Sequence, residues 1–247
     1  MATNYYSVYL DSNDGFSAVD HTDFKPTGAF TVGAWVKSAS DAGTKVIFSS
    51  FAYTGAPLKL AGIWFSLDSH KVYFYTARNT GNTTPGTDYQ YIYSNTSVDD
   101  GVWHWVVGTW DGAHLKVYVD GNSDATEVDW TYAPVYQATN YIRVGCASSN
   151  GDFTGPFTGS LDEVFLINGT AWTSTNVTSY YQKFIIGATN LKAYYQFENG
   201  NTDSSGNTHT LTNIDVPVFQ INSPFAGDVS TNYLKNYRAN TGGRLSF

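Results

Sequence analysis

A stretch of alternating side chains between two turn sequences is the feature that most constrains the fold of this chain. Residues 103–122 read WHWVVGTWDGAHLKVYVDGN, and the pair Asp111–Gly112 is typical of a two-residue type I′ turn. Successive side chains of a strand point to opposite faces, so Trp103 and Trp105 share one face. Large rings on one face of a strand normally fill the space between two sheets. We therefore expect a β-hairpin whose tryptophans are core residues and not a binding site.

Further strand patterns recur along the chain and are separated by turn-forming residues. The clearest is residues 30–37, where Phe30, Val32, Ala34 and Val36 alternate onto one face. The other expected strands are residues 45–49, 62–67, 71–76, 91–94, 141–145, 161–167 and 191–197. One short helix is expected near residues 174–182, capped by a hydroxyl side chain. Many short strands with almost no helix predict an all-β sandwich or barrel, and 247 residues fit one such domain.

The composition excludes several classes of partner. A net charge of −8 disfavours binding to nucleic acid or to an anionic membrane. No apolar run approaches the roughly 20 residues that a membrane-spanning helix needs. The single cysteine, Cys146, rules out an internal disulfide. Residues 1–5 lack the basic and apolar regions of a secretory signal, so we expect either that the chain is not exported by that route or that the numbering begins after a removed segment.

Three motifs follow one another in the order of a known family. AFTVGAWVK (residues 29–37), DGVWHWVVGTWDGAHLKVYVDG (100–121) and FTGSLDEVFLINGTAWT (157–173) resemble successive strands of laminin-G-like domains in the concanavalin A-like lectin/glucanase superfamily. The resemblance implies a jelly-roll β-sandwich of two antiparallel sheets. It also implies binding sites on the concave face or in the loops at its rim.

The C-terminal part departs from the usual order of that family. LKAYYQFENGNTDSSGNTHTLTN, residues 191–213, resembles the segment that in many relatives precedes the first strand. Because first and last strands lie side by side in such sandwiches, we expect residues 191–225 to complete the sandwich beside the N-terminal strand Tyr5–Leu10. Residues 1–225 then form one domain. Residues 226–247 are either a flexible tail or an arm that docks on a neighbouring subunit, and the arm is favoured by its apolar residues Tyr233, Leu234, Tyr237, Leu245 and Phe247.

Catalytic machinery is not evident in the sequence. Glycan hydrolysis needs two carboxylates, and the glucanases of the superfamily carry them as Glu-x-Asp-x-x-Glu or a form one residue longer. The one approach to this motif starts at Glu127, but Tyr132 or Ala133 stands where the second glutamate belongs. The histidines are isolated in sequence and show no zinc-ligand spacing: His21, His70, His104, His114 and His209. We therefore expect no enzymatic activity.

The sequence offers candidate ligands for calcium, which is coordinated by oxygen atoms of carboxylates, amides and backbone carbonyls. Asn201, Asp203 and Ser205 place oxygen side chains at alternate positions before Gly206. A second group comprises Asp11 and Asp14 with Asn13 between them, and Asp162 matches a position near calcium in several relatives. If the terminal strands are neighbours, these groups could form one structural calcium site. The alternative is that each is an ordinary turn rich in Asp and Asn.

Sugar binding needs exposed aromatic rings beside hydrogen-bonding side chains. Three loop-rich stretches offer such residues, and the candidates are Tyr53, Tyr89, Trp130, Tyr132 and Tyr136 with Asn82 and Asp88. A surface rich in tyrosine and asparagine also suits contacts with neighbouring protein subunits.

Two non-enzymatic functions fit these observations. The favoured one is a surface-displayed structural or adhesion protein, such as a capsid-decoration or tail component of a virion, with glycan-binding potential. The alternative is a lectin-like module of an extracellular or cell-surface protein, and a glycoside hydrolase is a distant third. Both the favoured function and the lectin-like alternative place the chain on a virion surface or outside the cell.

Overall fold

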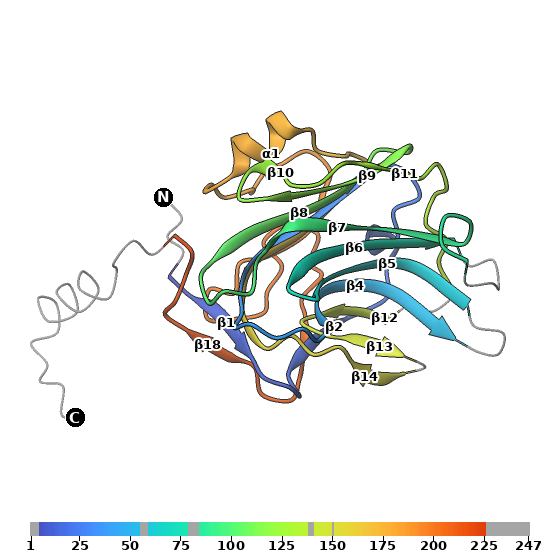
Figure 1. The fold of residues 1–247 in the computed structure, drawn as a ribbon. Coiled ribbons are helices and arrows are strands. Elements are labelled where there is room, and N and C mark those ends of the chain that lie inside the picture. The colour runs from blue at the N-terminus through green and yellow to red at the C-terminus, as the bar shows by residue number, and fades with distance from the viewer. Residues whose placement is uncertain (1–4, 55–58, 79–83, 138–140, 150, 226–247) are drawn as a thin grey trace, which may run out of the picture.

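The computed structural model describes residues 5–54, 59–78, 84–137, 141–149 and 151–225. Two large sheets stack on each other, and every pairing between their strands is antiparallel (Figure 1). This arrangement confirms the predicted all-β sandwich of two antiparallel sheets. The first sheet has the spatial order β10 (Asn122–Ser123), β9 (His114–Val119), β8 (His104–Trp110), β3 (Phe30–Lys37), β15 (Gly159–Asn168), β1 (Ser7–Leu10) and β18 (Val218–Gln220). We call it the nine-stranded sheet, since β11 (Val128–Asp129) pairs with β9 and β16 (Leu191–Tyr195) pairs with β15.

The second sheet is seven-stranded and carries the longest hairpins of the protein. Its spatial order is β17 (Thr212–Ile214), β2 (Gly15–Ala18), β12 (Tyr141–Val144), β4 (Lys45–Thr54), β5 (Lys59–Asp68), β6 (Lys71–Arg78) and β7 (Tyr89–Ser97). A small hairpin of β13 (Ala147–Ser149) and β14 (Asp152–Thr154) follows β12. A 3₁₀ turn, η1 (Thr22–Phe24), connects β2 to β3.

The main core lies between the two sheets. Phe30, Val32, Ala34 and Val36 are all buried there, as the alternation of β3 predicts. The ring of Phe30 meets Phe74 of the other sheet edge-on, with 5.8 Å between ring centroids. Position 108 in β8 requires a glycine, because a Cβ atom there would lie 2.8 Å from the Phe74 ring. The two sheets are therefore in direct contact through aromatic side chains.

Trp105 of β8 is buried and Trp103, just before β8, is partly buried, but both lie on the other side of their sheet from the predicted one. Trp105 is only 2% exposed and packs with Trp35 and Trp172 in a second hydrophobic cluster. Val106 and Trp110 take the inner positions of β8, so the alternation of the strand directs Trp105 outward. The prediction that Trp105 is a core residue is confirmed, whereas the prediction that it lies between the sheets is wrong.

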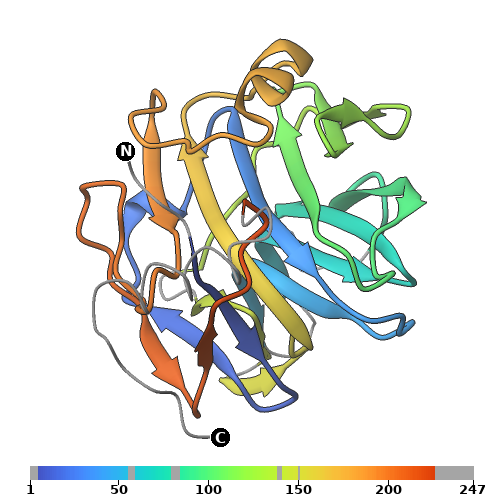
Figure 2. The same cartoon turned by 90° about the vertical axis from the view of Figure 1, so that its left-hand side faces the viewer.

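The second cluster is closed by the one short helix that the sequence predicts. Helix α1 (Ser174–Tyr180) begins at the N-cap Thr173, whose hydroxyl accepts from Asn176 N–H in a capping box. Figure 2 shows α1 at one end of the nine-stranded sheet, and Val177 of α1 is buried in the cluster. Tyr181 and Phe225 add their rings next to Trp35, at 5.7 Å each between centroids. The outer face of this sheet is therefore covered around Trp35 and Trp105.

The hairpin between β8 and β9 has a longer loop than predicted. Only Gly112 has a positive φ there, and the Asp111 carboxylate accepts from the N–H groups of Ala113 and His114 at 2.9 and 2.8 Å. The predicted two-residue turn at Asp111–Gly112 is therefore wrong. The backbone of a type I′ turn appears one hairpin later, where Asp120 and Gly121 have φ values of 49° and 84° between β9 and β10.

The C-terminal strands pair with the N-terminal ones. β18 pairs with β1, which lies between β18 and β15, and β17 pairs with β2. The Asp14 carboxylate adds a bond to this junction by accepting from Val216 N–H at 3.0 Å. The division into a domain of residues 1–225 and an arm stays a prediction, because residues 226–247 lie outside the described structure. No helix in the described ranges is both long and apolar enough to span a membrane.

Candidate functional site

The outer face of the seven-stranded sheet carries a continuous array of aromatic side chains. We call it the tyrosine face, and it consists of Phe51, Trp64, Tyr73, Tyr75, Tyr89, Tyr91 and Tyr93. They project from β4, β5, β6 and β7, which lie one beside the next in Figure 1. Phe51 and Tyr75 are buried at the base of the array, and the other five side chains are partly exposed.

The rings of the tyrosine face touch one another from strand to strand. Phe51 lies 5.4 Å from Trp64 and 5.6 Å from Tyr75, measured between ring centroids. Tyr73 continues the array to β7 through Tyr93 at 4.7 Å. Such contacts hold each ring against its neighbours, so little side-chain freedom remains to be lost when a ligand binds.

Strand alternation explains how the sequence builds this face. In β6, Val72 and Phe74 enter the core while Tyr73 and Tyr75 point outward. Antiparallel register then sets outward residues opposite one another: Trp64 with Tyr75, Tyr75 with Tyr91, and Tyr73 with Tyr93. The alternation was visible in the sequence, but which of its two faces would be covered was not.

Polar groups border the rings. The Tyr93 hydroxyl donates to the Asp68 carboxylate at 2.7 Å, and Trp64 Nε1 donates to Ser66 Oγ at 3.0 Å. Arg143 of β12 places its guanidinium 5.4 Å from the centre of the Tyr141 ring. Burial raises the pKa of Tyr73 well above the ordinary tyrosine value, with the neighbouring tyrosines adding to the effect, so its hydroxyl stays protonated.

Some of the predicted sugar-binding residues lie on or beside the tyrosine face, and others lie elsewhere. Tyr89 belongs to the tyrosine face, with its ring tilted by 37° against that of Tyr75 and 5.1 Å between the ring centroids. Asp88 is buried beside it and accepts from Thr84 N–H at 2.9 Å, so it orders the turn before β7. The Tyr53 side chain and all of Asn82 lie outside the described residues, and their roles stay predictions.

The remaining three candidates lie elsewhere, on the segment after β11. Trp130 is 2% exposed and Tyr136 packs against the core with its hydroxyl donating to Pro26 O at 3.1 Å. Trp130 does not offer the exposed ring that the prediction required, because its apolar area is used to close the sandwich, whereas Tyr136 is partly exposed. Tyr132 is exposed, with the Arg78 guanidinium 4.0 Å from its ring centre.

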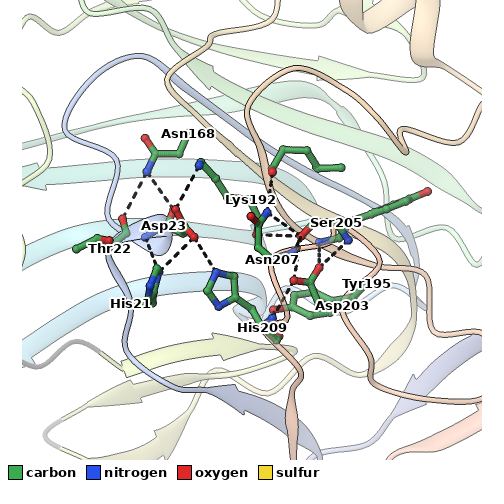
Figure 3. A network of polar contacts seen from close by, with 12 residues as sticks. His21, Thr22, Asp23, Asn168, Lys192, Tyr195, Asp203, Ser205, Asn207 and His209 are labelled. Carbon is green, nitrogen blue, oxygen red and sulfur yellow. Dashed lines mark hydrogen bonds and ion pairs between the residues drawn. The ribbon is translucent and has the colours of Figure 1, made fainter.

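The predicted calcium ligands are occupied by hydrogen-bond donors. Asp203 Oδ1 accepts from the N–H groups of Tyr194 and Ser205, and Oδ2 accepts from Ser205 Oγ and His209 N–H (Figure 3). The Asn201 amide nitrogen donates to Leu211 O at 2.6 Å. These are the bonds of a turn that fixes residues 201–209, and they leave the Asp203 carboxylate fully used.

The second predicted calcium group is likewise built into turns. Asp11 Oδ1 accepts from Asn13 N–H at 2.9 Å, and Asp14 Oδ2 accepts from Asp11 N–H at 3.1 Å. Asp162 is fully buried and accepts from Glu163 N–H at 2.9 Å. Within the described ranges, the carboxylates of Asp11, Asp14, Asp162 and Asp203 do not gather into one ligand group.

A different group does come together, and it includes two histidines that are isolated in the sequence. His21, Asp23 and His209 each direct one ligand atom to a common point, and these atoms lie within 4.8 Å of one another (Figure 3). Asp23 and His209 are 186 residues apart in the chain. Histidines that are isolated in the sequence are therefore close in space, because η1 packs next to the segment that follows β16.

A cleft of about 700 Å³ opens beside this group. Its walls are Thr22, Asp23, Lys25, Thr27, Pro134, Val135, Tyr136, Asn168 and Lys192. Both lysines already face carboxylates, Lys25 at 2.7 Å from Asp20 and Lys192 at 3.4 Å from Asp23. The cleft therefore has mixed polarity and paired charges, and it contains no aromatic array.

The glucanase-like segment lies at an edge of the nine-stranded sheet. Glu127 lies 3.1 Å from Lys116, and Asp129 is 95% exposed on the short edge strand β11. Both carboxylates sit beside His114, at 3.9 and 3.7 Å. Both carboxylates are therefore held beside basic side chains at the edge of the nine-stranded sheet.

Comparison with known proteins identifies the family. A family profile described as Laminin_G_3, of the concanavalin A-like lectin/glucanases superfamily, matches residues 10–178. The chain belongs to this superfamily. The resemblance seen in the three sequence motifs is thereby confirmed. No curated protein sequence matches the chain.

Solved structures of lectin-like and carbohydrate-binding proteins share the fold. A Bacteroides ovatus protein proposed to bind carbohydrate has 15% identity and a TM-score of 0.67, with 91% of this chain and 62% of that chain covered. A heptameric SAP-like pentraxin of Limulus polyphemus has 13% identity and a TM-score of 0.58, with coverages of 92% and 99%. The CBM40 of a Ruminococcus gnavus IT-sialidase has 12% identity and a TM-score of 0.56, with coverages of 73% and 100%. Identities this low show the shared fold alone.

The Asp203 turn gives a test of the calcium prediction. Replacing Asp203 with alanine leaves the N–H groups of Tyr194, Ser205 and His209 without their acceptor, so we expect a loss of about 2–4 kcal/mol in the free energy of unfolding. Urea unfolding should give the same loss in calcium and in EDTA. Asp152→Ala, at an exposed position of β14, is the control and should change stability little. A loss that appears only in calcium would instead show that Asp203 holds a metal ion.

Proposed function

We propose that the chain is a non-enzymatic glycan-binding protein and that the tyrosine face is its binding surface. The observation that carries the proposal is the ring array of β4–β7, whose members touch from Trp64 to Tyr93 while five of them keep part of their surface exposed. The outer face of the nine-stranded sheet also carries aromatic rings, but α1 and its neighbours cover the cluster around Trp35 and Trp105. The tyrosine face is thus the aromatic surface that is available to a ligand.

The chemistry of this face suits a sugar. Tyrosine and tryptophan rings offer apolar faces to the C–H groups of a pyranose, and their polar ends can bond its hydroxyls. Because Tyr73 and Tyr93 stay neutral, their hydroxyls can take part in neutral hydrogen bonds over the whole physiological pH range. Ordered rings with a few polar groups at the border are typical of small-ligand sites.

The comparisons support this assignment at the level of class. One similar structure is a carbohydrate-binding module, and in a second structure of that module α2,3-sialyllactose is bound. The incomplete glucanase motif, with Tyr132 or Ala133 in the place of its second glutamate, favours binding over hydrolysis at that segment.

Two substitutions test the tyrosine face. We expect Tyr91→Ala and Trp64→Ala each to weaken binding of the best ligand on a glycan array by about tenfold or more, because each removes a contact ring. Isothermal titration calorimetry with that glycan measures the change. Tyr9→Ala is the matched control, since Tyr9 is an exposed tyrosine of a strand in the other sheet. An array with no bound glycan, or unchanged affinity in both variants, would contradict the proposal.

We also propose that the protein is displayed on a surface, as a structural or adhesion component of a virion or as an extracellular lectin-like module. The weakly charged, tyrosine-rich composition supports either setting, with 14% charged and 17% aromatic residues. The apolar residues of the segment 226–247 favour the first, in which this segment docks on a neighbouring subunit.

Sedimentation velocity on the full chain and on a form ending at Phe225 tests the assembly role. The shorter form keeps the contact between Phe225 and Trp35, so its fold is expected to be retained. We expect oligomers of the full chain and monomers of the shorter form. Monomers in both forms would favour the lectin-like module, and oligomers in both would place the subunit contact outside residues 226–247.

A further inference from the structure

We propose that His21, Asp23 and His209 form a binding site for a divalent transition metal, with zinc as the representative ion. Two imidazoles and one carboxylate are ligands that zinc prefers, whereas calcium takes oxygen ligands. The site is separate from the tyrosine face, and it is also distinct from the turns in which the sequence predicted calcium.

Two of the three separations between the ligand atoms are already close to those of a metal site, and the two histidine nitrogens lie within 4.8 Å of each other. Asp23 Oδ2 lies 3.2 Å from His21 Nδ1 and 2.9 Å from His209 Nε2. In a tetrahedral site with zinc–nitrogen bonds of 2.0–2.1 Å, neighbouring ligand atoms are about 3.3 Å apart. Figure 3 shows both imidazole rings directed at the same carboxylate from opposite segments of the chain. Small movements would therefore place all three atoms around one ion.

The local structure positions the two histidines. His21 is the N-cap of η1, which the buried Phe24 anchors in the core, and a metal ion at Nδ1 would replace the bond that this nitrogen accepts from Asp23 N–H at 3.2 Å. His209 is fixed on both sides, because its N–H donates to Asp203 and its carbonyl accepts from the Tyr195 hydroxyl at 2.8 Å. Supporting bonds of this kind orient ligands before a metal arrives.

The surroundings determine how strongly the ion is held. The His21 side chain is 51% exposed, while Asp23 and His209 are 20% and 12% exposed, so an ion would enter from solvent and bind at the edge of the protein. The Lys192 ammonium, 3.4 Å from Asp23 Oδ1, opposes a second positive charge there. A zinc ion held by three side chains takes its fourth ligand from water.

Binding at this site would link two distant parts of the chain. η1 lies between β2 and β3, and His209 lies in the loop between β16 and β17. A ligand that binds the folded state and not the unfolded chain stabilises the fold in proportion to its affinity and concentration. Zinc is therefore expected to raise the melting temperature, because it would hold the loop that carries His209 to η1 in the N-terminal part of the sandwich.

Calorimetric titration of zinc chloride into tag-free full-length protein tests the proposal. We expect one zinc ion per chain, a rise in melting temperature with zinc, and no such rise with calcium. His209→Gln and Asp23→Asn should each weaken zinc binding by about tenfold or more. His114→Gln is the matched control, because His114 is a single histidine beside carboxylates, and it should bind zinc as the unaltered chain does.

Two further variants keep the test decisive if one of these substitutions disturbs folding. His21→Gln changes a half-exposed side chain and should also lose zinc, whereas Lys192→Met removes the opposing charge and should bind zinc more tightly. The absence of stoichiometric binding, or equal binding in the His21→Gln and His209→Gln variants and the unaltered chain, would overturn the proposal. None of these outcomes depends on glycan binding. The zinc experiments therefore do not test the proposal for the tyrosine face, and the glycan experiments do not test the proposal for zinc.

Discussion

The alternation of side chains along a strand is the constraint on which this structure depends. Each strand that fills the core with one set of residues must present the other set outward, and here both outward sets are aromatic. Apolar area of this size is costly to leave in water. On the nine-stranded sheet, α1 and the ring of Tyr181 cover it around Trp35 and Trp105. On the seven-stranded sheet the rings shield one another only in part, and that remaining exposure is the physical basis of the proposed binding surface.

The same constraint explains which parts of the fold could be predicted from the sequence. Alternation in residues 30–37 identified a strand and its buried face, and the structure has both. Alternation could not say which side of β8 would meet the other sheet, because Val106 and Trp105 are each suitable core residues. That choice depends on what packs from outside, and the cover over Trp105 comes from residues 172–188, far along the chain. The outward tyrosines of β6 were missed for the same reason, since their pattern alone does not distinguish a covered face from an exposed one.

Sites made by distant residues were beyond the sequence for a different reason. Asn201, Asp203 and Ser205 have the composition of a cation loop, yet local N–H and O–H donors reach the Asp203 carboxylate first. That turn instead positions His209. The partner of His209 is Asp23 in η1, which is close in space but 186 residues earlier in the chain. Local spacing carries information about turns, whereas the neighbours of His209 are set by how β16 and β17 pair with β15 and β2.

Hydroxyl-radical footprinting, with and without the most tightly bound glycan, tests most directly whether the exposed aromatic sheet is where recognition happens. Oxidation is read by mass spectrometry on peptides that cover β6 and β7 and, for comparison, on those that cover β1 and the cleft around Lys192. The account predicts that bound glycan protects Tyr73, Tyr91 and Tyr93 and leaves Tyr9 unchanged. Protection confined to the cleft at Asp23 and Lys192, with the tyrosines oxidised as before, would contradict it.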